Sequence, residues 1–392
     1  MPDRASAERF LREPLEFLDH AFPAAGEALL LPGRQLCVAA PGASRAILAN
    51  DGGLYQEHSD FFHTSRGPFG PRSLQIEIGR AARALLRTHI TQFAGELPGK
   101  VRRALVPTSD WPDAGNYLVY RHFAAALASP DSPLRFQRTL DQIVERSVLA
   151  GSRQRGLRIA RALYQSRALR ELAKAIETRR QHATAQAGAA SESTHRNGAR
   201  QPADLLDVVA AAGPPATAAE LAEIFVSFLF AIAGSVGFVL GWSLYLLGTN
   251  PPTDAEPAWV VREALRLWPV AWLLGRRPAR PHKVAGESVT PDDQVVVCPY
   301  LVHRDARHWE DPHSFRPERW AAVDDHHAFL PFGWGPHRCV AAALAMQVVE
   351  DIVRIVVDEY RLTVTPLDGR PCVGPALAPP RFTLDLCPRT TA

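Results

Sequence analysis

The longest stretch without a charged residue, Ile224 to Thr253, constrains the fold more than any other part of the 392-residue chain. Its apolar part, Ile224 to Leu247, is long enough to cross a bilayer as a helix. Two structures suit such a segment: a membrane span, or a helix buried at the centre of a large soluble protein. Three serines interrupt the run, it lies in mid-chain, and no basic cluster flanks it, all of which favours the buried helix.

Composition narrows the class of protein further. The chain is 46% hydrophobic and 22% charged, which is enough apolar material for a large core. Its net charge of +3 argues against a protein that relies on a wide phosphate-binding field, so we expect no nucleic-acid partner. The charged segment from Met1 to Phe22 lacks the apolar core of a signal peptide. Five scattered cysteines without a CxxC pair predict a reducing compartment, and we expect a cytoplasmic protein.

Helical periodicity dominates the pattern, with minor sheet near both ends. The predicted helices are Arg80–Gly95, Tyr117–Leu127, Leu134–Ala150, Arg155–Gln181, Ala218–Gly248, Ala258–Leu267 and Ala341–Tyr360. The predicted strands are Gln35–Ala39, Gln294–Cys298, Leu362–Val364 and Arg381–Leu386. We therefore predict a mainly α chain with minor β structure, folded as a single domain over residues 1–392.

Two segments refine this reading. Thr217-Ala-Ala-Glu220 has the pattern of a capping box that opens the long apolar helix. Residues Gln181 to Pro202 are rich in Ala, Ser, Gly, Gln and His and have no apolar period. We expect them to form a flexible surface loop between two helices.

The strongest chemical signal is Phe332-Gly-Trp-Gly-Pro-His-Arg-Cys-Val-Ala341, which a predicted helix follows at once. Its glycines let the backbone approach a flat ligand closely. Its cysteine, Cys339, stands at a helix N-terminus, where the helix dipole and free N–H groups favour the thiolate. A thiolate in such a place suits an axial ligand to haem iron.

This loop resembles that of the cytochrome P450 family, which reads Phe-Gly-x-Gly-x-His-x-Cys-x-Gly. The chain departs from it only at the last position, where Ala341 replaces glycine. Glu263-Ala-Leu-Arg266 matches the family's Glu-x-x-Arg motif, and Pro317-Glu-Arg319-Trp matches its Pro-Glu-Arg-Phe-like segment. The resemblance implies a buried triad of Glu263, Arg266 and Arg319, and a helix-rich fold whose long central helix passes over the haem.

By the same resemblance the cofactor is haem b, with Cys339 as its iron ligand and Phe332, Gly333 and Ala341 beside it. The family's propionate-contacting histidine corresponds to His337, and its propionate arginine to Arg276 or the neighbouring Arg277. On the family's C helix the matching cation is missing. Arg80, Arg83 and Arg87 share one helical face there, and either Arg83 or a merely solvated basic face fits the pattern.

The central helix departs from the family pattern, which carries an acid–alcohol pair for proton delivery. Alignment on Ala233-Gly234 puts Val236 and Gly237 in those two places. An alignment without gaps from the downstream residues puts Gly234 in the acid position and Ser235 in the alcohol position. We prefer this second alignment. The carboxylate is missing in either case, so Ser235, ordered water or a substrate hydroxyl must deliver protons. A Ser235 hydroxyl that merely bonds the carbonyl one turn back is the alternative. The family's J helix, between Gly248 and Glu263, is expected to be trimmed.

The family's pocket positions are apolar here, which predicts a hydrophobic substrate such as a terpenoid or another natural product. These positions are Phe61, Phe62, Phe69, Phe228, Ala231, Ile232, Val270, Ala271, Trp272, Leu273 and Leu377. Core packing explains each of them equally well.

The resemblance implies a haem-thiolate monooxygenase that takes electrons from a ferredoxin and its reductase. We expect a monomer without a membrane partner, and Arg304, Arg307 and Arg338 as candidates for a basic docking face. The missing acid also allows an oxidative-coupling, desaturating or peroxide-dependent enzyme. A non-catalytic haem-fold module that recruits a partner is a further alternative, but such a module has no use for the thiolate of Cys339.

Overall fold

The computed structural model describes residues 4–57, 59, 61–149, 158–191, 201–213, 216–323 and 326–389. The chain divides into two compact units, each assembled from three separate segments. Unit 1 comprises Met1–Asp60, Trp242–Ala342 and Arg370–Pro379, and unit 2 comprises Phe61–Gly241, Ala343–Gly369 and Pro380–Ala392. That all 392 residues behave as one domain stays a prediction.

Unit 1 combines short helices with a mixed four-stranded sheet of order β1-β2-β9-β6. Its helices are α1 (Arg4–Arg12), α2 (Pro14–Ala25), α3 (Pro41–Ala49), α13 (Pro257–Leu267), α14 (Pro299–Val302) and the 3₁₀ turns η4 (Pro317–Ala322) and η5 (Gly335–His337). The sheet strands are β1 (Ala28–Leu31), β2 (Gln35–Val38), β9 (Gln294–Val297) and β6 (Leu274–Arg276). Two hairpins complete it, β7 (His282–Val284) with β8 (Glu287–Val289), and β11 (Cys372–Val373) with β12 (Leu377–Ala378).

The parallel pair in this sheet joins segments that lie far apart in the sequence. Gln35 of β2 is in register with Gln294 of β9, and Val38 with Val297. Both strands were predicted from their apolar, β-branched residues, and both are confirmed. One face of the sheet packs into a core that also contains the aromatic rings of Trp242 and Trp309.

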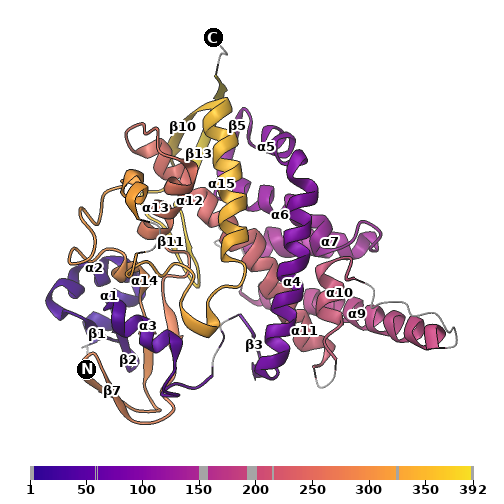
Figure 1. Cartoon of the computed structure of the whole chain (residues 1–392), viewed down its shortest axis with the longest axis horizontal. Coiled ribbons are helices and arrows are strands. Elements are labelled where there is room, and N and C mark those ends of the chain that lie inside the picture. Colours follow the sequence, from indigo (N-terminus) through magenta and orange to yellow (C-terminus); the bar gives the residue numbers. More distant parts are fainter. Residues whose placement is uncertain are drawn as a thin grey trace. The chain divides into compact units, whose positions relative to one another are not determined.

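Unit 2 is a group of helices with a three-stranded antiparallel sheet, β10-β13-β5 (Figure 1). Its helices are α4 (Arg72–Phe93), η1 (Ala94–Glu96), α5 (Leu97–Leu105), α6 (Asp113–Leu127), α7 (Leu134–Ile143), the π turn η2 (Val144–Val148), α9 (Arg158–Ser191), α10 (Leu205–Ala210), α11 (Ala218–Leu229), the π turn η3 (Phe230–Val236) and nearly all of α15 (Ala342–Glu359). Its strands are β3 (His63–Thr64), β4 (Gly67–Pro68), β5 (Thr108–Trp111), β10 (Tyr360–Pro366) and β13 (Phe382–Pro388).

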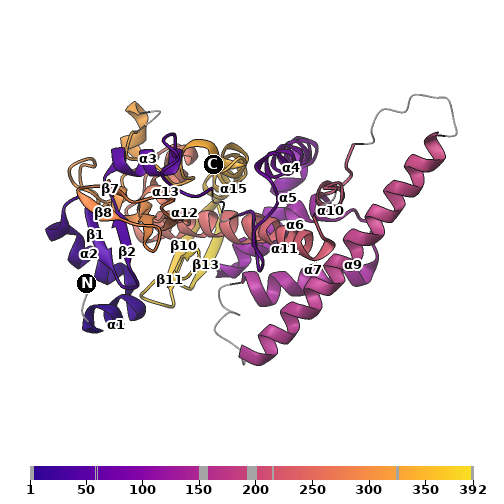
Figure 2. The ribbon, with the colours of Figure 1, turned by 90° about the horizontal axis from the view of Figure 1, so that it is seen from below.

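The helix α9 corrects the prediction of a loop after Gln181. Figure 2 shows it as one long rod, and it continues to Ser191. Residues 181–191 contain five alanines, which have the highest helix propensity and extend a helix even without an apolar face. Residues 192–200 of the predicted loop lie outside the described residues.

The long apolar segment is helical, as predicted, and begins at the predicted capping box. The Thr217 hydroxyl accepts from the N–H of Glu220, while the Glu220 carboxylate accepts from the N–H of Thr217. From there α11, η3 and α12 (Gly237–Thr249) follow without a break. Within the described residues this is the one helix long and apolar enough to cross a membrane, and 67% of its most apolar window is buried inside the structure. A core helix passes the same test, so the evidence for a membrane span is weak. No helix lies between Thr249 and Pro257, in agreement with the trimmed J helix.

Candidate functional site

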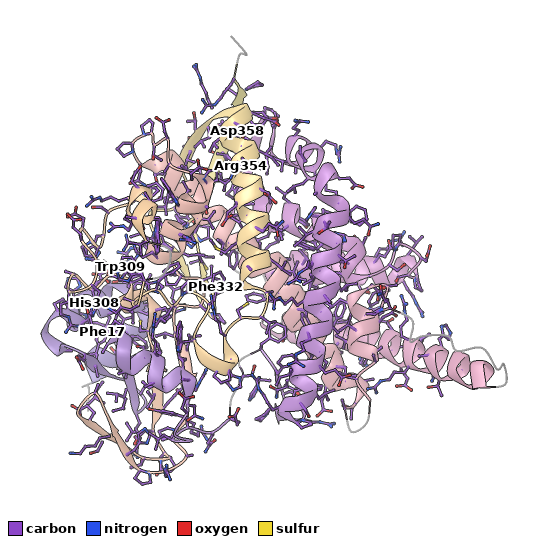
Figure 3. The ribbon with its side chains drawn as sticks, in the orientation of Figure 1. Phe17, His308, Trp309, Phe332, Arg354 and Asp358 are labelled. Carbon is purple, nitrogen blue, oxygen red and sulfur yellow. The ribbon has the colours of Figure 1, made fainter. Side chains whose placement is uncertain are left out.

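The glycine-rich loop before α15 is held in shape by its backbone. Gly333 and Gly335 both have φ of +71°, in the left-handed region that favours glycine. A Cβ on Gly335 would lie 2.7 Å from the Cα of Ala49 in α3, so the loop backbone rests directly on that helix. The N–H of Cys339 donates to the carbonyl of Phe332 at 3.0 Å and closes the loop. Figure 3 labels Phe332 at the start of this loop.

Side chains of unit 1 secure the same loop. The guanidinium of Arg45, on α3, lies 4.0 Å from the centre of the Trp334 ring, a cation–π contact. His337 Nε2 lies 2.9 Å from a carboxylate oxygen of Glu57. Neither Arg45 nor Glu57 was selected from the sequence, because a lone charged residue almost 300 positions upstream carries no signal of its partner.

The thiol of Cys339 is both accessible and crowded. The residue as a whole is exposed, which leaves room for a ligand to approach the sulfur. Close packing of atoms around the thiol nevertheless raises its pKa, while the N–H of Ala341 and the charge of Arg338 act to lower it. The accessible surface decides whether a ligand can reach the sulfur, and the packing decides how well its charge is solvated. The predicted stabilisation of the thiolate by a backbone N–H is present at Ala341, but burial outweighs it, so the pKa of the Cys339 thiol is raised.

In the same unit, Arg266 on α13 is fully buried, and its guanidinium makes five hydrogen bonds. Two go to the carboxylate of Glu263, at 2.8 and 2.9 Å. The other three go to the carbonyls of His303, Pro312 and Ser314, at 2.8, 2.7 and 3.0 Å. One arginine therefore ties the helix α13 to the irregular chain between β9 and the loop.

Glu263, also fully buried, gathers the rest of this cluster. Its Oε1 accepts from Nε of Arg319 at 3.1 Å and from the N–H of Arg316 at 3.0 Å. Its Oε2 accepts from the indole N–H of Trp320 at 3.0 Å. Burial lowers the pKa of Arg319, which the Glu263 charge partly offsets. The structure thus brings the predicted residues Glu263, Arg266 and Arg319 together.

Comparison with known proteins agrees with this geometry. Residues 258–380 match the family model Cytochrome P450. Cytochrome P450 4V2 of Mus musculus is 27% identical over 186 residues, which cover 40% of this chain and 35% of that protein. Cyclooctatin synthase of Streptomyces melanosporofaciens is 27% identical over 198 residues, which cover 43% of this chain and 42% of that protein. The chain thus spans about two fifths or less of these relatives' length.

The likeness in fold extends much further along the chain. The solved structure of the open cytochrome P450 EryK from S. erythraea superimposes with a TM-score of 0.70 at 18% identity, and the match covers 95% of this chain and 96% of that one. Residues 258–380 therefore match the cytochrome P450 family, and the whole chain has the fold of these proteins. Its helix-rich fold with small sheets is confirmed.

The donor chemistry of this site fits a haem. Among the described residues no group of three or more His, Cys, Asp or Glu side chains is placed to hold a metal ion. A porphyrin brings its own four nitrogen donors to the iron, so the protein need add only one axial ligand. The exposed residue Cys339, on a loop whose glycines keep the backbone clear of side chains, has the donor chemistry that such a ligand needs.

The predicted propionate partners differ in their surroundings. Arg276 lies in β6, 7% exposed, and donates to the carbonyl of Gly275 at 2.7 Å. Arg277 is exposed. Of the two, Arg276 is the better candidate for a propionate partner, because its side chain faces into the protein. Arg83 on α4 is exposed, as are Arg80 and Arg87, which agrees with a solvated basic face.

On the central helix, Gly234 and Ser235 lie in the π turn η3. Ser235 Oγ makes no hydrogen bond to any described residue, so the bond to the carbonyl one turn back, which was the alternative, does not form. Asn116 of α6, which the sequence analysis missed, donates its side-chain amide to the carbonyls of Ala233 and Gly234. A polar residue on the otherwise apolar face of α6 was the signal that could have found it.

The four predicted phenylalanines form one aromatic cluster in unit 2. Phe61 contacts Phe62 and Phe228 edge to face, with ring centres 5.0 and 4.6 Å apart. Phe62 stacks with Phe69 at 6.3 Å. Nearby on the long helix, Ile232 is buried and Ala231 is half-buried. The structure therefore gathers predicted pocket residues from the segment before α4 and from α11.

The remaining predicted pocket residues lie in unit 1. The N–H of Leu377 donates to the carbonyl of Val270 at 2.9 Å, and the indole of Trp272 donates to the carbonyl of Gly374 at 2.8 Å. Ala271 and Leu273 beside them are half-buried. Trp272 and Leu377 also belong to the main core of the unit, so packing accounts for them. An open groove of about 580 Å³ bordered by α1, α2 and β1 contains none of these residues.

Of the three arginines considered for a docking face, the buried Arg304 proves unsuited to it, whereas the side chain of Arg307 is 50% exposed. Arg304 is 8% exposed, and its guanidinium lies 3.8 Å from the ring centre of Tyr300 and 4.6 Å from that of Trp268. Arg307 is paired with Asp305 at 2.6 Å. Arg338, in the glycine-rich loop, is exposed.

Proposed function

We propose that this P450 is a haem-thiolate monooxygenase that oxidises a hydrophobic small molecule. The observation that carries the proposal is the exposed residue Cys339 on a glycine-rich loop, in a unit that also contains the buried Glu263–Arg266 cluster. The curated relatives in the same family and the matching folds support it. Haem b, when bound, supplies the oxygen-activating and electron-accepting chemistry.

The chain's own residues position that cofactor and tune it. Cys339 provides the sulfur ligand, and the N–H of Ala341 and the charge of Arg338 stabilise its thiolate form. Arg276 and His337 are the cations for the propionates. The cluster around Glu263 keeps the chain behind the loop rigid, because removing any member leaves a buried charge without its partner.

Proton delivery falls to Ser235, whose hydroxyl makes no hydrogen bond within the described chain. No residue from Phe230 to Gly241 is acidic, so the usual carboxylate has no counterpart there. That absence favours, as a second candidate, an oxidative-coupling, desaturating or peroxide-dependent reaction, which needs this relay less strictly. Turnover with peroxide alone supports the second candidate, and a hydroxylated product formed from O₂ and a reductase system supports the first.

The aromatic cluster of Phe61, Phe62, Phe69 and Phe228 supports an apolar substrate. A terpenoid or another natural product fits this surface, and one relative is a Streptomyces cyclooctatin synthase. We further propose that a separate ferredoxin and reductase supply the electrons, and that the protein is a cytoplasmic monomer without a membrane or nucleic-acid partner.

The absorption spectrum of the reduced, CO-bound protein tests this proposal. We expect the long-wavelength Soret band of thiolate ligation in the wild type and in Cys387→Ser, which removes another exposed cysteine. Cys339→Ser should lose that band and all turnover. A Cys339→Ser protein with unchanged haem content, absorption and turnover would refute the assignment.

A further inference from the structure

Asn116 makes a buried polar contact between two helical segments of unit 2, α6 and η3. The residue is 0% exposed. Its Nδ2 donates to the carbonyl oxygen of Ala233 at 2.6 Å and to that of Gly234 at 3.0 Å. One side chain of α6 therefore holds two successive carbonyls of the π turn η3.

Those carbonyls belong to a helix segment that has left regular α geometry. A π turn replaces the i to i+4 hydrogen bonds of an α-helix with i to i+5 bonds, and such turns are rare outside functional sites. Side-chain amides that donate to displaced carbonyls compensate for part of the lost regular bonding. The two bonds from Asn116 therefore favour the π turn over a continuous α-helix.

Gly237 makes this contact possible. A Cβ at Gly237 would lie 2.5 Å from Nδ2 of Asn116 and 2.7 Å from its Cα, distances that no real Cβ tolerates. The helix α6 therefore approaches the turn closely only because position 237 has no side chain. Asparagine and glycine act as a matched pair on two helices.

The other polar atom of Asn116, Oδ1, is buried and accepts no hydrogen bond from the described chain. An unsatisfied buried acceptor costs ~1–3 kcal/mol. The residue is thus a poor choice for stability alone, since an isosteric apolar side chain would avoid that cost. A role in shaping the turn explains why the amide is present.

We propose that Asn116 is a positioning residue for the central helix: it fixes the π turn that carries Gly234 and Ser235. Because the helix has no carboxylate of its own in this region, the amide from α6 sets where the Ser235 hydroxyl stands. The inference deepens the proposed monooxygenase function and, in its catalytic part, rests on it.

Hydrogen exchange of the purified ferric protein tests the structural part without turnover. Asn116→Leu keeps the branched shape of the side chain and removes the orphaned acceptor, so we expect little change in Tm. Loss of the two bonds should raise exchange at the backbone amides of residues 230–241 about tenfold. Gly237→Ala, which pushes α6 away while Asn116 stays intact, should raise exchange in the same peptide. Unchanged exchange in both variants would overturn the proposal.

The matched control is Asn250→Leu, because Asn250 donates to the carbonyl of Leu246 at 2.9 Å on the same long helix. Its effect should stay within residues 246–253. In turnover assays Asn116→Leu should release several-fold more of its reducing equivalents as hydrogen peroxide, with KM unchanged. If exchange is faster in Asn116→Leu but the wild type shows no turnover, the enzyme assignment is refuted and the positioning role stands. Faster exchange with an unchanged peroxide yield would refute the catalytic part alone.

Discussion

The indole N–H of Trp320 donates a 3.0 Å hydrogen bond to Oε2 of Glu263, the oxygen that also accepts from Nε of Arg266. The family's motif places an aromatic ring at this position, and here the ring also provides a donor. Trp320 is 3% exposed, so the bond lies inside the protein. The buried carboxylate thus has a neutral donor beside its two cationic partners.

Trp320→Phe should keep the ring packing and destabilise the fold by about 2 kcal/mol, because a hydrogen bond to a charged acceptor is lost. Trp309→Phe is the control in the same core, since the Trp309 indole donates to the neutral carbonyl of Val302 at 3.2 Å. Figure 3 shows Trp309 beside His308. Urea unfolding of the two variants should give the larger loss for Trp320→Phe, and equal losses would contradict this account.

A comparison of Gly335→Ala with Gly333→Ala distinguishes the effect of backbone strain from that of a steric clash between the new Cβ and α3. Both positions have φ of +71°, so each alanine costs about 1 kcal/mol of strain. Only at position 335 would the Cβ also strike Ala49, 2.7 Å away, whereas at position 333 the nearest neighbour atom is 3.7 Å away. We expect haem to dissociate at least tenfold faster from Gly335→Ala than from Gly333→Ala. Similar rates would show that the contact with α3 does not hold the loop.

His122 makes the stability of unit 2 depend on pH. Burial, with smaller contributions from Lys100 and His89, lowers its pKa from 6.5 to about 4. Its Nδ1 is buried without a hydrogen-bond partner among the described residues. The folded state therefore disfavours the protonated ring, and stability is lost as pH falls from about 6.5 towards 4.

For this single group the loss at pH 5 is about 2 kcal/mol. His122→Phe should remove most of it, so its urea midpoint should fall less between pH 7.5 and pH 5 than that of the wild type. His182→Phe, at an exposed position, should follow the wild type. If His122→Phe is as sensitive to acid as the wild type, other groups cause the loss.

Glu223 clamps the segment that carries three of the clustered phenylalanines. Its carboxylate accepts from the N–H and from the hydroxyl of Ser65, both at 2.7 Å. Glu223→Gln removes the charge that strengthens both bonds. Exchange at the amides of residues 61–69 should rise about fivefold, whereas Glu177→Gln on the exposed side of α9 should leave it unchanged. A wild-type exchange pattern in Glu223→Gln would show that Phe228 and its neighbours hold the segment alone.

The parts that could be predicted from the sequence depend on short motifs. Cys339 and the pair Glu263–Arg266 stand in fixed local patterns, so their neighbours could be named before any coordinates. The strands β2 and β9 were each predicted from a short strand-like run, although the sequence did not predict that they pair. In each case the chemistry is encoded within about ten residues.

Other features depend on contacts whose partners the local sequence does not identify. Asn116 meets its partners 117 and 118 positions later, so a polar residue on the apolar face of α6 could draw attention to it but could not name those partners. Arg304 was considered as a surface cation, but in the structure its guanidinium lies against the rings of Tyr300 and Trp268. The helix beyond Gln181 was missed because its alanines have high propensity but no apolar period.

The interleaving of chain segments bears on how this protein is made. In unit 1 Glu13 pairs with Arg370, 357 positions later, and in unit 2 the strand β5 needs β13 as its neighbour. A ribosome must therefore release the chain as far as Arg370 before unit 1, and as far as β13 before unit 2, can complete these contacts. During synthesis the apolar stretch from Ile224 to Leu247 therefore lacks its final packing partners. We expect chaperones to bind the nascent chain at this stage.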